Sequence, residues 1–425
     1  MATDIKDASQ PLDASALIGL LPAPPRILAL GEPTHGEDAL LRLRNDLFRQ
    51  LVERYGYRTI ALETDCLRGL AVDAHVTPDT GGLNTGGPDT DLPDTDRPDT
   101  GGPDTGDLDA VMEHGFSHGW GALAANRELV RWMRAHNERR PASEQVRFAG
   151  FDGPLEIEAA ASPRQALTAL HRHLAAHLDA DLLPCAADTL DRLLGPDDAW
   201  TEPAAMYDAA RSVGRSDEAR ELRLLADDLV ALLDTQAPRL LAAASPDDHE
   251  RALLYGRTAT GLLRYHHAMA DPSPARLTRL AAERDRMMAH NLLALAGRGP
   301  VLVYSHNTHL QREESAMRMG GGPLEWWGAG ALVASRLGRE YAFVATALGT
   351  ITHRGVDAPP PDTVEGLLYD LPEDRHLVDP GRLAAALGGT PPAPRESPWF
   401  GYAPFDPAHL GSVDGLVYVR DVPRG

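Results

Sequence analysis

The chain has 425 residues, of which 43% are hydrophobic, so it can bury a large core and form more than one compact unit. Its 62 acidic and 41 basic residues give a net charge of -21, which repels phosphate backbones and anionic membrane surfaces and disfavours nucleic acid or lipid as a partner. The two cysteines, Cys66 and Cys185, belong to no CxxC or Cys/His cluster, so a disulfide framework or a thiolate zinc site has no support.

The first structural signal is residues 27–30, a short apolar run that precedes a glycine and is typical of a buried parallel strand. Residues 38–55 carry leucine, phenylalanine and valine at helical spacing, and Gly56 follows where a helix would end. Residues 59–62 read as a second buried strand. These elements predict an α/β unit near the start of the chain.

Residues 77–107 repeat Pro-Asp-Thr five times among glycine-rich spacers. This composition buries no apolar surface and cannot offset the entropy of its own ordering. We expect a disordered surface loop that interrupts the α/β unit.

The remaining elements continue the alternation of helices and strands. A helix is expected over residues 123–138, and strands are expected over 146–150, 301–304, 341–347 and 415–419. Between the third and fourth strands, residues 162–298 are rich in Ala, Leu and Arg with a period near 3.6 and no convincing strand, which indicates a helical insertion.

The sequence therefore predicts an α/β fold, with a parallel-sheet core flanked by helices and a largely helical inserted subdomain. The core is expected to consist of residues 1–161 and 299–425, and the subdomain of residues 162–298. No stretch approaches the roughly 20 apolar residues of a membrane span, and no signal-peptide core is recognisable near the amino terminus. We expect a cytoplasmic protein. The oligomeric state is not predicted.

Polar residues follow each predicted strand of the core, where ligands of open α/β sheets bind. The four strand ends carry Glu32 and His35, then Glu63 and Asp65, then Asp152, then His306, Asn307 and His309. Buried charges need partners, so four such strand ends are unlikely to arise without a shared site.

Several segments resemble the erythromycin esterase family, in order and spacing. They are GEPTHGEDALLRLRNDLF, TIALETD, ANRELVRWMRAHN with FAGFD, ERDRMMAHNL and VLVYSHNTHLQR, spread over residues 27–347. The resemblance implies an α/β core with a helical subdomain, ester hydrolysis and no cofactor. It also implies a small-molecule ester or lactone as substrate, with macrolides and other secondary metabolites as candidates.

The resemblance also assigns roles to single residues. The family's essential histidine falls on His35, with its partner acid on Glu32 and a second acid on Glu63. Its later histidine pair falls on His306 and His309, and a functional arginine falls on Arg284.

The chain departs from the family pattern at Ala39, where relatives usually carry a glutamate. Trp326 and Trp327 follow the glycine-rich segment 319–323, as in an actinomycete-type subgroup, and one of them is expected to contact a bulky apolar substrate. Asp65, Asp152 and Asn307 are also expected to line the substrate pocket. The departure at Ala39 and the tryptophan pattern weaken the case for erythromycin itself as the substrate.

The chemistry suits these residue types. Imidazole, with an ordinary pKa near ~6.5, is the side chain best matched to removing a proton from water at neutral pH, so His35 is the expected general base. Glu32 or Glu63 would fix its tautomer and stabilise the imidazolium. His306, His309 and Arg284 are candidates to stabilise an oxyanion or to protonate the leaving alcohol.

Four competing interpretations remain open. The string Gly115-Phe116-Ser117-His118-Gly119 matches the GxSxG pattern of serine hydrolases, but no strand is predicted before Ser117. His35, His306 and His309 could instead bind a divalent metal in a metal-dependent hydrolase, although no HExxH motif is present. Acyl transfer or cyclisation in natural-product biosynthesis is the third alternative, and ligand binding without turnover is the fourth.

Overall fold

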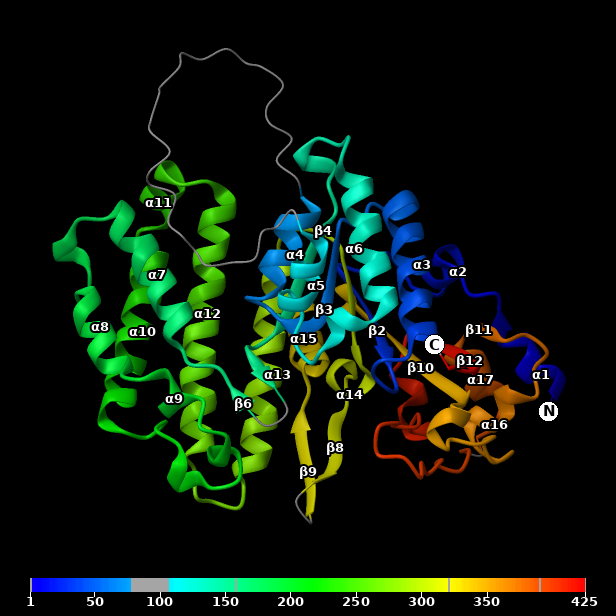
Figure 1. The fold of residues 1–425 in the computed structure, drawn as a ribbon. Coiled ribbons are helices and arrows are strands. Elements are labelled where there is room, and N and C mark those ends of the chain that lie inside the picture. The colour runs from blue at the N-terminus through cyan, green and yellow to red at the C-terminus, as the bar shows by residue number, and fades with distance from the viewer. Residues whose placement is uncertain (1, 78–106, 157–158, 320–321, 390, 425) are drawn as a thin grey trace. The chain divides into compact units, whose positions relative to one another are not determined.

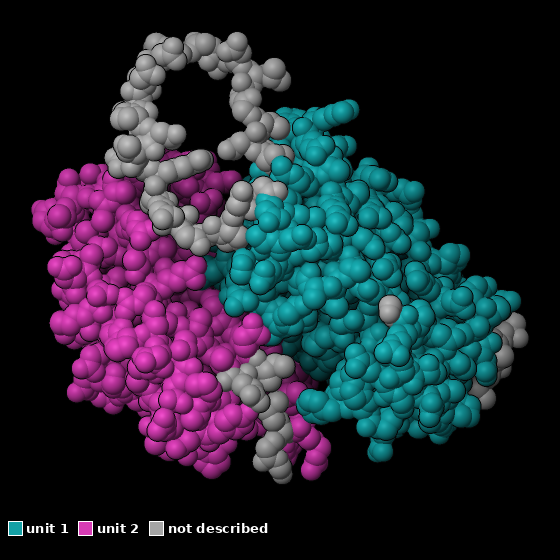
Figure 2. All heavy atoms as spheres, in the orientation of Figure 1, with its two compact units in different colours: residues 1–150, 295–312, 334–425 teal, residues 151–294, 313–333 magenta. Residues whose placement is uncertain are grey.

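The computed structural model describes residues 2–77, 107–156, 159–319, 322–389 and 391–424. The Pro-Asp-Thr repeat, expected to be a disordered loop, lies outside the described residues except for its end positions Thr77 and Asp107. The chain divides into two compact units, coloured separately in Figure 2. Unit 1 comprises residues 1–150, 295–312 and 334–425, and unit 2 comprises residues 151–294 and 313–333.

A mixed sheet of eight strands forms the centre of the described α/β core (Figure 1). In spatial order the strands are β1 (Ser9–Gln10), β11 (Arg375–Val378), β12 (Gly415–Asp421), β10 (Tyr341–Thr350), β2 (Ile27–Glu32), β7 (Val301–His306), β3 (Thr59–Asp65) and β4 (Arg147–Asp152). The strands from β12 to β3 run parallel; at one edge β11 pairs antiparallel with β12, and β1 pairs antiparallel with β11. The predicted α/β fold with a parallel-sheet core is confirmed.

Helices of unit 1 cover the sheet because their apolar faces match its buried strands. They are α1 (Ala2–Asp7), α2 (Ala14–Leu20), α3 (Asp38–Tyr55), α4 (Gly69–Val76), α5 (Leu108–His114), α6 (Ala124–Asn137), α14 (Asn307–Leu310), α16 (Val364–Tyr369) and α17 (Pro380–Ala386). The largest hydrophobic cluster joins α2 to α6 with the strands, and its centre includes Phe48, Leu51 and Leu129. The predicted helix of residues 38–55 is confirmed at both ends, and Gly56 terminates it with a left-handed φ of 72°.

Unit 2 is mainly helical. Its helices are α7 (Arg164–His177), α8 (Ala187–Leu194), α9 (Asp197–Trp200), α10 (Asp217–Thr235), α11 (Ala237–Ala243), α12 (Pro246–Met269) and α13 (Arg276–Ala296), with α15 (Ala329–Leu337) after β9; the last residues of α13 and α15 belong to unit 1. The short strands β5 (Leu155–Glu156) and β6 (Ala159–Ala160) pair with each other. A hairpin of β8 (Glu314–Met319) and β9 (Gly322–Trp327) was not expected from the sequence. None of the helices in the described ranges is long and apolar enough to span a bilayer.

Candidate functional site

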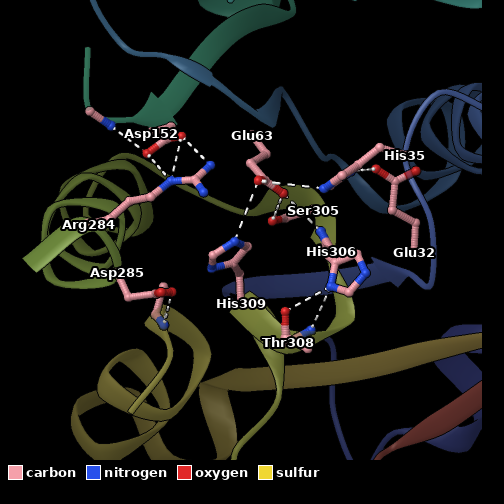
Figure 3. A network of polar contacts seen from close by, with 12 residues as sticks. Glu32, His35, Glu63, Asp152, Arg284, Asp285, Ser305, His306, Thr308 and His309 are labelled. Carbon is pink, nitrogen blue, oxygen red and sulfur yellow. Dashed lines mark hydrogen bonds and ion pairs between the residues drawn. The ribbon is translucent and has the colours of Figure 1, made fainter. Parts of the chain in front are cut away.

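The carboxyl ends of three neighbouring parallel strands hold the main polar cluster of unit 1. Strand β7 lies between β2 and β3, and its register places His306 opposite Glu32 and Tyr304 opposite Leu62. Because parallel strands end at one edge of a sheet, residues far apart in the chain meet there. Figure 3 shows the resulting cluster around Glu63.

His35 lies in the loop after β2 and contacts the carboxylate that ends this strand. Its Nδ1 atom is 2.8 Å from Oε1 of Glu32, a side chain that is 4% exposed, whereas the His35 side chain is 40% exposed (Figure 3). A neutral imidazole that donates its Nδ1 proton to Glu32 carries its lone pair on Nε2. The contact therefore favours the tautomer that a general base requires at Nε2.

Glu63, at the end of β3, is buried and is held from two sides. Its Oε2 atom accepts hydrogen bonds from the Ser305 hydroxyl at 2.5 Å and from the His306 backbone N–H at 3.0 Å. Its Oε1 atom lies 4.0 Å from Nε2 of His35 and 3.6 Å from Nε2 of His309. Oε1 thus faces two imidazoles while Oε2 is anchored to β7.

His306 is neutral and oriented by its own loop. Burial, and to a lesser extent the nearby His35, lower its pKa to about 3 against the opposing effect of Glu63. Its Nε2 donates to the carbonyl of Pro33 at 3.3 Å, and its Nδ1 accepts from the backbone N–H and hydroxyl of Thr308. His306 therefore ties the loop after β7 to the loop that carries His35, and its single ring proton is engaged by the Pro33 carbonyl.

Three further residues adjoin this cluster and were missed by the sequence analysis. The Tyr304 hydroxyl donates to Oε2 of Glu32 at 2.6 Å, and the buried Arg44 guanidinium lies 5.0 Å from the centroid of the Tyr304 ring. The Trp120 ring lies 5.2 Å from the His35 ring. Arg44 could have been noticed, because it interrupts the apolar stripe of α3 at a position where a charge must be buried.

Unit 2 holds a second group of predicted residues. Asp152 is fully buried, and its carboxylate binds Nε and Nη2 of Arg284 on α13 at 2.6–3.2 Å (Figure 3). The Arg284 side chain is 27% exposed, so its guanidinium is held by a fixed carboxylate yet remains reachable. This forked pairing is the geometry in which arginine is oriented most firmly.

The two tryptophans of β9 differ in their surroundings. Trp326 is buried, and its indole N–H donates to Oδ2 of Asp285 at 2.7 Å; Oδ1 of Asp285 accepts from the Ala329 backbone at 2.8 Å. Trp327 is 54% exposed. These contacts give Trp326 a structural role, and the prediction of a tryptophan that contacts substrate rests on Trp327.

Three polar groups near the strand ends serve the fold. Oδ1 of Asp65 caps the turn after β3 by accepting from the backbone of Leu67, and the Asn307 amide exchanges two hydrogen bonds with the backbone of Thr346. The Ser117 hydroxyl is buried between Thr64 and the Asp65 backbone, and in the described residues helix α5, not a strand, directly precedes it. The contacts thus give no support to substrate binding by Asp65 or Asn307, and Ser117 lacks the strand-turn-helix setting of a nucleophile elbow.

A metal site was one alternative for the histidines. Within the part of the chain that the structure describes, no group of three or more His, Cys, Asp and Glu side chains is placed so that it could hold a metal ion. Both ring nitrogens of His306 are hydrogen-bonded, to Thr308 and to the Pro33 carbonyl. The two carboxylate oxygens of Glu32 are hydrogen-bonded to His35 and Tyr304. The described geometry offers a hydrogen-bonded acid–imidazole pair at this edge of the sheet, Glu32 with His35 at 2.8 Å, and places Glu63 within 4.0 Å of two imidazoles.

Comparisons with known proteins give a consistent picture. The family model described as erythromycin esterase matches residues 52–422, a range that contains Glu63, Arg284 and His306 and begins after His35. None of the curated proteins matches the chain.

Three solved structures share the fold. A crystal structure from Bacillus cereus has a TM-score of 0.69 at 17% identity and covers 99% of this chain and 97% of its own. A structure described as a succinoglycan biosynthesis protein has a TM-score of 0.63 at 15% identity, with 99% and 96% covered. An erythromycin esterase EreC mutant in its open conformation has a TM-score of 0.61 at 18% identity, with 97% and 93% covered.

Proposed function

Because the chain belongs to the erythromycin esterase family, we propose that it hydrolyses a carboxylic ester or lactone of a small molecule, with His35 as the general base. Family membership supports a hydrolase that acts on esters. Macrolides and other secondary metabolites are the candidate substrates. The observation that carries the mechanism is the 2.8 Å contact between Nδ1 of His35 and Glu32, which presents the Nε2 lone pair for proton abstraction.

In the proposed reaction, Nε2 of His35 takes a proton from water as the water oxygen bonds to the ester carbonyl carbon. The imidazolium that forms is stabilised by the Glu32 carboxylate. Collapse of the tetrahedral intermediate breaks the bond between the carbonyl carbon and the alkoxy oxygen, and the proton on Nε2 passes to the leaving alcohol. A positioned general base of this kind contributes roughly 10²–10⁴-fold to the rate.

Glu63 is proposed to orient the attacking water. Its Oε1 atom lies 4.0 Å from Nε2 of His35, a separation at which a water molecule between the two groups can contact both. His309, 3.6 Å from the same oxygen, is a candidate to donate a hydrogen bond to the oxyanion. The family pattern assigns a functional arginine to Arg284, whose guanidinium is oriented by Asp152.

Acyl transfer is an alternative to hydrolysis because this chain has Ala39 where relatives usually carry a glutamate. Ala39 packs against the hydrophobic core of unit 1 and adds no polar group to the cluster. Hydrolysis and transfer also differ in their products, because only hydrolysis adds one water to the substrate.

The test is turnover of a panel of macrolides, simple lactones and aryl esters, with products weighed by mass spectrometry. The purified protein is compared with His35→Ala and with the control His114→Ala, which removes a histidine whose side chain is 58% exposed on α5. We expect a product one water heavier, lost in His35→Ala, kept in the control and unaffected by a chelator. Activity abolished by chelator and restored by a divalent metal would contradict the mechanism, and acyl transfer to an added alcohol without water-driven cleavage would contradict hydrolysis.

A further inference from the structure

Tyr304 is an interior residue of β7 whose side chain ends at the candidate site. It is 4% exposed, and the register of the sheet places it opposite Leu30 of β2 and Leu62 of β3. A residue inside a central parallel strand is ordinarily apolar, because both faces of the sheet are covered. Tyr304 instead brings a hydroxyl into the core, and this hydroxyl lies 2.6 Å from Oε2 of Glu32.

The direction of this hydrogen bond is fixed. Burial and the adjacent Glu32 carboxylate raise the pKa of the Tyr304 phenol well above its usual range, so the hydroxyl stays protonated and donates. The Arg44 guanidinium lies 5.0 Å from the ring centroid and is itself held by Asn126 at 2.8 Å, so the ring is restrained from the other side. Each oxygen of Glu32 then has one partner: Tyr304 at Oε2 and His35 at Oε1.

We propose that Tyr304 is a positioning residue that fixes the Glu32 carboxylate and, through it, the tautomer and basicity of His35. This inference deepens the proposed function and rests on it for its effect on turnover. A hydroxyl donor on Oε2 stops the carboxylate from rotating and draws negative charge away from Oε1. The remaining charge at Oε1 is enough to hold the Nδ1 proton of His35 without over-stabilising the imidazolium.

The change Tyr304→Phe removes one oxygen and keeps the ring, its packing and its contact with Arg44. The other described groups that face His35, namely Glu63, His306 and Trp120, are untouched. The matched control is Tyr57→Phe, which also removes a buried phenol hydroxyl, but one that donates to the carbonyl of Pro25 at 3.2 Å ahead of β2.

The first readout is the protonation of His35, followed by histidine ring ¹⁵N NMR over a pH series and therefore independent of any substrate. In the unmodified protein we expect the neutral ring to carry its proton on Nδ1. In Tyr304→Phe we expect the pKa of His35 to rise by roughly one unit, because Oε1 then carries more of the carboxylate charge. Tyr57→Phe is expected to match the unmodified protein.

The second readout is ester turnover. The acid limb of the kcat/KM profile should move upward in pH with the pKa of His35, and kcat should fall about tenfold with KM within about twofold, as expected when a hydrogen bond to a charged group is lost. In a Glu32→Gln background, Tyr304→Phe should have no further effect on the pKa of His35, because Tyr304 acts on His35 through the Glu32 carboxylate.

The outcomes separate this inference from the proposed function. An unchanged pKa and tautomer of His35 in Tyr304→Phe overturns the positioning role, whatever the protein hydrolyses, and so does a shift that persists in the Glu32→Gln background. Absence of ester turnover together with the expected NMR shift overturns the hydrolase proposal alone. If Tyr304→Phe fails to fold, 3-fluorotyrosine at position 304 supplies a stronger donor, which should lower the pKa of His35; no change there overturns the role as well.

Discussion

Replacement of Ser305 by alanine should impair both stability and turnover, because its hydroxyl anchors Glu63. The Ser305 hydroxyl donates to Oε2 at 2.5 Å, next to the His306 N–H, which donates to the same oxygen at 3.0 Å. Glu63 is 2% exposed, so water cannot freely replace the lost donor. A hydrogen bond to a charged group is worth roughly 1.5–3 kcal/mol, and we expect a loss of that size in the free energy of unfolding at pH 7.

Urea denaturation, read as a shift of the midpoint at unchanged slope, measures this loss. Ester turnover by Ser305→Ala should fall about tenfold, because Oε1 of Glu63 is then less firmly placed opposite His35 and His309. Ser117→Ala is the matched control, since its hydroxyl is also buried and doubly hydrogen-bonded, but to Thr64 and the Asp65 backbone. Unimpaired turnover by Ser305→Ala, or a fall no larger than that of the control, would refute the anchoring role.

Further predictions concern the fold and its pH dependence. Ser117→Ala should lower stability by roughly 1–3 kcal/mol yet retain turnover, and an inactive but folded variant would restore the serine-nucleophile interpretation. Gly31→Ala should destabilise the protein by roughly 1–3 kcal/mol in thermal unfolding, because its new Cβ would meet Oδ1 of Asn307 at 2.1 Å; wild-type stability would contradict this crowding. Burial lowers the pKa of His306 to about 3 and that of His266 to about 4. The unfolded chain therefore binds more protons below pH ~6.5, so stability should fall by about 1.4 kcal/mol per pH unit per histidine as the pH drops from there towards 4, and His266→Phe should lessen the slope measured by urea titration.

The sheet core was predictable because its strands are buried on both faces. Residues 27–30, 59–62, 301–304 and 341–347 are mainly apolar runs, and each lies inside an observed strand. The pair β8 and β9 was missed because both strands are short and alternate exposed with more buried residues, a weak signal beside the long helical segment before them. Strand β11 has only four residues and depends on pairing with β12.

The residue types of the site could be predicted from the sequence, but the orientations of their side chains could not. A position after a strand brings Glu63 and Asp65 to the same edge, yet the side chain of Glu63 joins the histidine cluster while Asp65 caps its own turn. Tyr304 was hidden inside an apolar run, where a tyrosine counts as a strand residue and its hydroxyl gives no sequence signal. Hydrogen-bond direction depends on side-chain torsions and on partners hundreds of residues away, which spacing along the chain does not encode.

The most direct test of the central claim, that His35 activates water for attack on an ester, is a single turnover in H₂¹⁸O with enzyme in excess over a substrate identified in the panel. Attack by activated water places one ¹⁸O atom in the carboxylate product during the first turnover, and His35→Ala should reduce the rate by roughly 10²–10⁴-fold. A first-turnover product without ¹⁸O would mean that a carboxylate of the protein had supplied the oxygen, and that result, or a variant as fast as the unmodified protein, would contradict the account.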